Sequence, residues 1–163
     1  MKKIVSYMMT GILLLSFLLT GCGSPEPQTG KKMSMYYINT AETKVEVHEQ
    51  YLNTKTLDEQ LDETMRYLST TPEKLEYKAP LDMGFRVLDY EVEDGKLLIN
   101  VDKAYSELSP TTEVLVRAAI VRTLTQLPNV KYVGITVEDS QLYDNAGEMV
   151  GWMNADQLDR KST

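Results

Sequence analysis

The one thiol in this sequence of 163 residues belongs to Cys22, and a thiol can act as a nucleophile or accept a lipid group. Lys2, Lys3 and an apolar run over residues 4–19 precede it, which is the pattern of a secretory signal peptide. That run has 16 residues and ends in small residues, whereas a membrane-spanning helix needs about 20. We therefore predict that residues 1–21 are a signal peptide, cleaved just before Cys22.

The sequence Leu19-Thr20-Gly21-Cys22 resembles the lipobox of bacterial lipoproteins. The resemblance implies that the Cys22 thiol receives a diacylglyceryl group, that Cys22 becomes the first mature residue, and that palmitate is among its acyl groups. Two acyl chains hold a protein at a membrane much more stably than one. We expect a cell-membrane protein, lipid-anchored on the extracytoplasmic face. The alternative is a free or buried cysteine that happens to follow a signal peptide.

His48 is the sole histidine, and it has Glu46 and Glu49 near it on an expected strand. A zinc site needs further nitrogen or sulfur ligands, which this composition does not offer. We therefore interpret His48 as a surface residue and expect neither a metal nor a cofactor.

Asp58, Glu59, Asp62 and Glu63 form an acidic cluster at helical spacing. A glycosidase needs two carboxylates that face each other across a sugar-sized gap. These four are expected to share one outward face of a helix, so we interpret them as a solvated surface.

A second acidic group, Asp139, Asp144, Asn145 and Glu148, surrounds a predicted turn. It lacks the ligand spacing of a known calcium loop. The sequence also has no Gly-x-Ser-x-Gly motif for serine catalysis. The ten tyrosines could stack on sugars, but half-buried sheet tyrosines are the commoner case. We predict no catalytic residue.

The net charge of the chain is −7. Removing residues 1–21 takes away two lysines and no acid, which leaves 142 residues with 15 basic and 24 acidic side chains, a net charge of −9. Such a domain is repelled by nucleic acid and by anionic lipid. We therefore expect no nucleic-acid partner, and membrane attachment through acylated Cys22 alone.

Periodicity predicts the elements that hold these residues. A short apolar, aromatic run indicates a strand at 35–38, and alternating residues indicate a second at 45–51. Thr56 and Glu59 have the spacing of a capping box, which predicts a helix from there to Ser69 with Leu57, Leu61, Met65 and Leu68 on its apolar face. Ser109 and Pro110 should begin a second, central helix that ends near Leu127. A strand from Val130 to Val137 and a hairpin around residues 144–147 should follow.

Asp94-Gly95 lies between two alternating segments and is a favoured two-residue hairpin turn. Counting outward pairs Val92 with Leu97, Tyr90 with Ile99 and Leu88 with Val101, all on one side. The other, mostly solvated side should carry Asp89, Glu91, Leu98 and Asn100.

These elements predict an α+β fold in which two helices pack on one face of a mixed sheet. We assign residues 1–21 to the signal peptide, 22–34 to a flexible linker, 35–155 to one domain and 156–163 to a C-terminal tail.

Two segments carry a resemblance to a known family. They are the hairpin sequence DGKLLINVD (residues 94–102) and the helix end RTLTQLPNVKYV (residues 122–133). Tyr36-Tyr37-Ile38-Asn39 and Pro80-Leu81 with Gly84, Arg86 and Val87 extend it. Together they resemble the GerMN domain over about residues 35–155. The resemblance implies a ring-building-motif-like fold, an exported and often lipid-anchored bacterial protein, and no established catalytic activity.

We therefore expect a non-enzymatic envelope module, linked to sporulation, germination or envelope assembly, that binds a protein or peptidoglycan and can form oligomers. The sheet near Tyr36, Tyr90 and Tyr132, or an unpaired edge strand, is the expected contact surface. The alternative is a peptidoglycan-binding accessory or hydrolase of cell-wall metabolism, for which the sequence offers no nucleophile, metal site or acid/base pair.

Overall fold

The computed structural model describes residues 30–71, 76–144 and 146–160. The predicted signal peptide and Cys22 lie outside these ranges. The chain forms, in order, β1 (Lys31–Asn39), β2 (Val45–Leu52), α2 (Leu57–Leu68), β3 (Tyr77–Lys78), β4 (Val87–Glu93), β5 (Lys96–Val101), the 3-10 helix η1 (Lys103–Glu107), α3 (Pro110–Leu124), β6 (Tyr132–Val137), β7 (Ser140–Gln141) and α4 (Ala155–Arg160).

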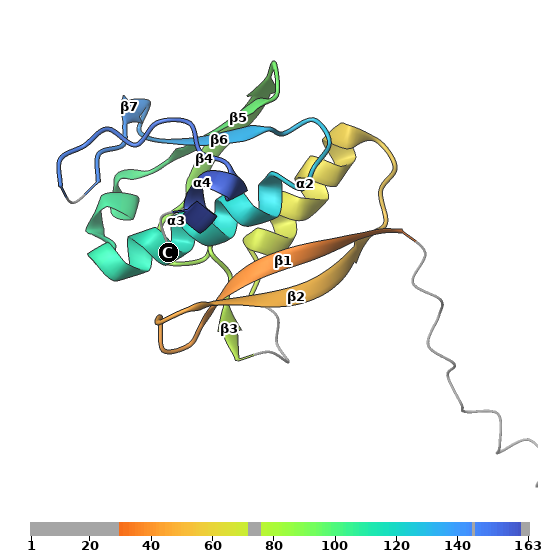
Figure 1. Ribbon diagram of the computed structural model, residues 1–163, viewed down its shortest axis with the longest axis horizontal. Helices are drawn as coiled ribbons and strands as arrows, with labels where there is room; N and C mark the ends of the chain where they lie inside the picture. The colour runs from red at the N-terminus through yellow and green to blue at the C-terminus, as the bar shows by residue number, and fades with distance from the viewer. Residues whose placement is uncertain (1–29, 72–75, 145, 161–163) are drawn as a thin grey trace, which may run out of the picture.

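The fold is α+β, as predicted, but the strands divide between two sheets. The first sheet has the order β2-β1-β3 and is antiparallel, and the second has the order β4-β5-β6-β7. Only β5 and β6 run parallel among the paired strands of the second sheet, joined by a crossover through η1 and α3. In Figure 1, α2 and α3 lie between the β1–β2 ribbon and the strands β5 and β6.

Helix α2 begins as predicted. The Thr56 side chain accepts a hydrogen bond from the Glu59 backbone N–H, and the Glu59 carboxylate reaches back to the Thr56 N–H. Leu61, Met65 and Leu68 are buried against the core, whereas Leu57 is exposed. The apolar stripe is therefore one turn shorter than the sequence pattern indicates.

The β4–β5 hairpin has the predicted turn, with φ of 50° at Asp94 and 80° at Gly95. The pairs Val92 with Leu97 and Tyr90 with Ile99 are confirmed. The third predicted pair, Leu88 with Val101, was wrong, because a β-bulge shifts the register between Val87 and Asp89. Val87 instead of Leu88 faces Val101, and the bulge turns the Leu88 side chain out to solvent.

Helix α3 is the central one. Ser109 caps it, Pro110 occupies its first turn, and it ends at Leu124, three residues before the expected end. Its buried residues are Thr112, Val116, Ala119, Ile120, Val121, Thr123 and Leu124. Its remaining face is less covered, since Val114 is 51% exposed.

Two side chains from the end of α3 bind the open edge of β1. The Gln126 amide donates to the Ser34 carbonyl at 2.7 Å and accepts from the Ser34 N–H at 3.0 Å, as a neighbouring strand would. The Thr123 hydroxyl accepts from the Tyr36 N–H at 3.0 Å. Since β3 pairs only with Ile38 and Asn39, these side chains complete the edge that it leaves open.

The C-terminal segment crosses back over the second sheet. Val133 of β6 and Met153 exchange both backbone hydrogen bonds, at 2.8 and 2.9 Å. The predicted final hairpin is present as a single bridge between Tyr143 and Met149. Its turn residue Asn145 lies outside the described residues. Two elements extend past the assigned boundaries, because β1 begins within the range given to the linker and α4 occupies most of the range given to the tail.

Candidate interaction surface

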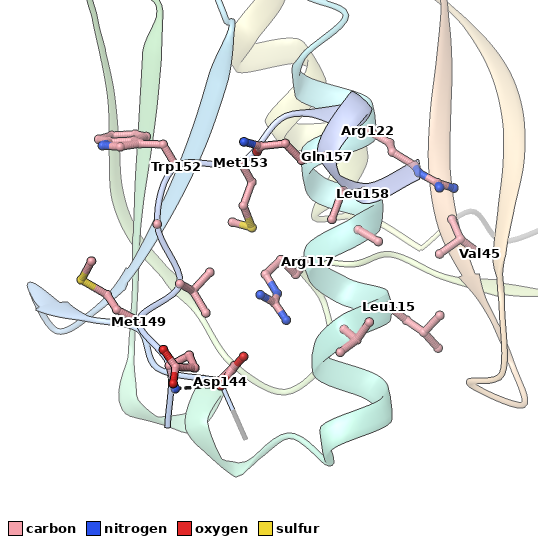
Figure 2. A pocket seen from close by; sticks show the side chains of 15 residues that line it. Val45, Leu115, Arg117, Arg122, Asp144, Met149, Trp152, Met153, Gln157 and Leu158 are labelled. Atoms are coloured by element: carbon pink, nitrogen blue, oxygen red, sulfur yellow. Dashed lines mark hydrogen bonds between the residues drawn. The ribbon is translucent and has the colours of Figure 1, made fainter. Parts of the chain in front are cut away.

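A groove of about 930 Å³ lies between α3 and the segment from Asp144 to Leu158. Figure 2 shows its two walls, with Arg117 on α3 pointing toward the side of Met153 in the C-terminal segment. Leu115 lies on the other side of α3, toward Val45 of β2. Ala118 and Val150 add to the apolar lining. The groove is partly open to solvent, so a surface contact can reach it.

Arg117 is the charged residue at the centre of the groove, and it is held in place from below. Its guanidinium donates to Glu113 Oε2 at 2.9 Å, one helical turn earlier. Glu113 Oε1 accepts from the hydroxyl of the buried Tyr105 at 3.0 Å. Burial, with the Glu113 carboxylate nearby, raises the pKa of the Tyr105 hydroxyl well above its usual value. The Tyr105 hydroxyl, the Glu113 carboxylate and the Arg117 guanidinium are linked by these hydrogen bonds, which hold the Arg117 side chain in place.

Sequence reasoning missed this network. The i,i+4 spacing of Glu113 and Arg117 on a predicted helix was a sufficient signal for the ion pair. The third member, Tyr105, comes from η1, whose position under α3 follows only from the tertiary fold.

Large apolar side chains are exposed around the groove. Val114 stands on α3, and Met149 and Trp152 are 56% and 42% exposed on the opposite wall. Figure 2 shows that Trp152 and Met149 point away from the groove, toward the outer face of the second sheet. Several exposed apolar side chains that lie near one another mark a contact surface more often than a single exposed apolar side chain does.

The predicted acidic face of α2 needs one correction. Asp58, Glu59 and Asp62 are exposed, but Glu63 is buried. Its carboxylate accepts from the backbone N–H groups of Asn53 and Thr54, at 2.9 and 3.1 Å, and from the Thr54 hydroxyl at 2.7 Å. Burial alone would raise the pKa of Glu63, but these hydrogen bonds outweigh it, so its pKa is lowered. Glu63 therefore fixes the β2–α2 connection.

Asn100, predicted on a mostly solvated side, is also buried. Its amide donates to Asp139 Oδ1 at 2.7 Å and accepts from the Asp139 N–H at 3.0 Å. Asp139 and Glu138 have positive φ in the turn between β6 and β7. The first residue of the Asn100-Val101-Asp102 motif thus holds that turn, and Asp102 binds the Arg86 N–H and guanidinium across the hairpin.

The group considered for calcium is divided between two turns. Asp139 is bound to Asn100, while Asp144 accepts from the N–H groups of Ala146 and Glu148, both at 2.9 Å. His48 lies on β2, partly exposed, opposite Met35 of β1. Over residues 30–71, 76–144 and 146–160, no group of three or more His, Cys, Asp or Glu could hold a metal ion.

The three tyrosines expected on one contact surface are separated. Tyr36 belongs to the first sheet and lies under the Arg122 guanidinium, whereas Tyr90 and Tyr132 belong to the second. The Tyr90 hydroxyl donates to Asp62 of α2 at 2.8 Å, so it ties the hairpin to the helix. None of the described helices is both long and apolar enough to cross a membrane.

Comparison with known proteins agrees with this architecture. Residues 34–143 match the family model Germane, described as sporulation and spore germination. The match covers more than half of the sequence, so the chain belongs to this family. The chain is similar to the first GerMN domain of the sporulation protein GerM from Bacillus subtilis, with a TM-score of 0.59 and 14% identity over 78% of this chain and 98% of that one.

The chain is also similar to the tandem GerMN domains of the same protein, with a TM-score of 0.54 and 17% identity over 83% of this chain. The alignment covers 49% of the tandem structure. At these identities the likeness establishes the fold alone. A search of curated proteins found no match.

Proposed function

We propose that this protein is a non-enzymatic module of the cell envelope, lipid-anchored at Cys22 on the extracytoplasmic face, that acts by contact with a protein partner. Its family is described as sporulation and spore germination, which supports a role in one of these processes. The proposed organisation is a cleaved signal peptide over residues 1–21, a tether, and one GerMN-type domain.

One observation carries the contact role. Arg117, which lines the groove, is held by the Glu113 carboxylate, and Glu113 in turn accepts from Tyr105 outside the groove. Val114, Met149 and Trp152 are exposed around the groove. Catalysis by acid and base needs groups free to exchange protons with a substrate. An interaction surface needs exposed apolar side chains with a polar rim. The groove fits the second description.

The test compares two substitutions in cells. Val114 borders the groove and Val47 lies on β2 outside it, and both are 51% exposed, so Val114→Glu and Val47→Glu make the same chemical change at matched exposure. We expect crosslinking of the membrane-anchored protein to a defined envelope protein to be lost in Val114→Glu and kept in Val47→Glu. The purified protein should not hydrolyse peptidoglycan. Turnover of peptidoglycan, abolished by Glu113→Gln, would replace the contact role with an enzymatic one.

A further inference from the structure

The second sheet ends in two edge strands, β4 with seven residues and β7 with two, so β4 is its long edge. On the opposite side of the sheet, β7 and Met153 pair with β6. Because the turn has two residues, Glu93 and Lys96 form its hydrogen-bonded pair, and antiparallel pairs alternate from there. The N–H and C=O groups of Tyr90 and Val92 therefore point away from β5. In the described part of the chain, no strand pairs with this edge.

The exposed face beside this edge is acidic. Asp89, Glu91 and Glu93 alternate along β4, and all three side chains are exposed. Across the described ranges, none of the three has an ion-pair partner. Three carboxylates in a row on an edge strand disfavour pairing with any strand of like charge.

An apolar strip continues across the same face of the sheet. Leu98 of β5 is paired with Glu91 on one side and with Gly134 of β6 on the other. The Trp152 ring covers Gly134, and the Lys96 ammonium lies 5.4 Å from the ring centroid. A segment added to β4 would therefore lie beside carboxylates first and an exposed aromatic ring beyond them.

We propose that the β4 edge binds an extended segment of a protein partner that carries Lys or Arg at alternate positions, with apolar residues between them. Cross-strand pairs of opposite charge stabilise a sheet and like pairs destabilise it, so the three carboxylates select basic residues. The same rule excludes pairing of β4 with β4 of a second copy, since carboxylates would meet carboxylates. The proposal rests on the contact function above and adds the chemistry of the partner.

Trp152 is the sole tryptophan of the chain, so fluorescence of the full-length protein in detergent micelles reports on this face directly. Two synthetic probes of equal length are used, one alternating Lys and Val and the other alternating Glu and Val. We expect the Lys–Val peptide to bind at least about tenfold more tightly. Its affinity should fall with added salt, because the carboxylates are exposed. Equal binding of the two peptides would overturn the proposal.

Substitutions separate the edge from general attraction to an acidic protein. Glu91→Lys should weaken binding of the Lys–Val peptide about fivefold or more. Glu107→Lys makes the same charge change at an exposed position of η1 and should change it by less than about twofold. A triple variant in which Asp89, Glu91 and Glu93 are each changed to Lys should bind the Glu–Val peptide more tightly than the Lys–Val peptide. Equal losses in Glu91→Lys and Glu107→Lys would show that no specific edge is used.

Two further outcomes also overturn the proposal. A dimer of the unchanged protein that Glu91→Lys dissociates would assign the edge to a second copy. If neither peptide binds while Val114→Glu still abolishes crosslinking in cells, the contact function stands and the assignment to β4 fails.

Discussion

Gly134 and Trp152 are in direct contact across the second sheet. A Cβ placed on Gly134 would lie 2.8 Å from Cζ3 of Trp152 and 3.0 Å from Cε3, closer than side chains tolerate. The absence of a side chain on β6 is therefore what lets the indole ring lie on the strand. Since Met153 pairs with Val133 in the same stretch, this contact also fixes the C-terminal segment that forms one wall of the groove.

Gly134→Ala should displace the Trp152 ring and destabilise the protein by about 1–3 kcal/mol. The emission maximum of the sole tryptophan should shift to longer wavelength in the folded state, because the ring becomes more hydrated. Gly151→Ala is the matched control, since a Cβ there would meet nothing within 4 Å and its φ is not positive. Identical spectra for the two variants would show that the contact does not hold the ring.

Gly95→Val should destabilise the protein by about 1–2 kcal/mol, because a β-branched residue is strained at a φ of 80°. Thermal unfolding measures the loss. Gly95→Asn, which tolerates this region of φ, should cost less. A midpoint that is the same for Val as for Gly would exclude a turn of this type.

Glu63→Gln should make the free energy of unfolding depend less on pH in the acid range. The folded-state pKa of Glu63 is depressed below its unfolded value, so the carboxylate stabilises the fold above that unfolded value, about 4.3. This contribution is lost as pH falls through the folded pKa. At pH 7 the substitution should cost about 1–3 kcal/mol, and the difference from the unchanged protein should shrink below pH 4.

Urea unfolding at a series of pH values measures this difference. Asp58→Asn changes an exposed carboxylate of the same helix and serves as the control. A constant gap between the unchanged protein and Glu63→Gln from pH 7 to pH 3 would contradict the role given to the Glu63 charge.

Gln126→Ala should release the edge of β1 at Ser34, where one amide side chain makes both backbone hydrogen bonds. We expect a loss of about 1–3 kcal/mol, and faster hydrogen exchange at the Ser34 amide than at its neighbours. Gln141→Ala, on the exposed β7, is the control. Unchanged exchange at Ser34 would indicate that another group protects this edge.

Cys22→Ala should abolish incorporation of labelled fatty acid and release the protein from the membrane fraction, because a chain with a net charge of −9 after residue 21 is repelled by anionic lipid. Metabolic labelling and fractionation measure both. Lipid-labelled Cys22→Ala protein in membranes would place the anchor elsewhere.

The sequence predicted the features that depend on neighbouring residues. The capping box at Thr56, the turn at Asp94 and Gly95, and the start of α3 at Ser109 were all confirmed, because each follows from spacings of a few residues. The α+β class followed from the order of these elements.

The failures depend on distant contacts. The bulge at Leu88, the division into two sheets and the burial of Asn100 are decided by which strands meet. Glu63 occupies a helical position at which the sequence pattern predicts a solvent-exposed side chain. Its role depends on the β2–α2 connection, whose backbone N–H groups donate to its carboxylate. The groove could not be predicted either, because its two walls come from segments about 30 residues apart.

The pairing of Val133 with Met153 limits the stoichiometry of any complex built on the second sheet. A strand added at β4 finds no equivalent place on the far side of β6, because the chain's own C-terminal segment already occupies it. Within the described residues, the other edge of this sheet is the two-residue β7, so a longer strand can add at β4 alone. Extension by this route ends at a single partner, so growth into filaments would require a different surface of the molecule.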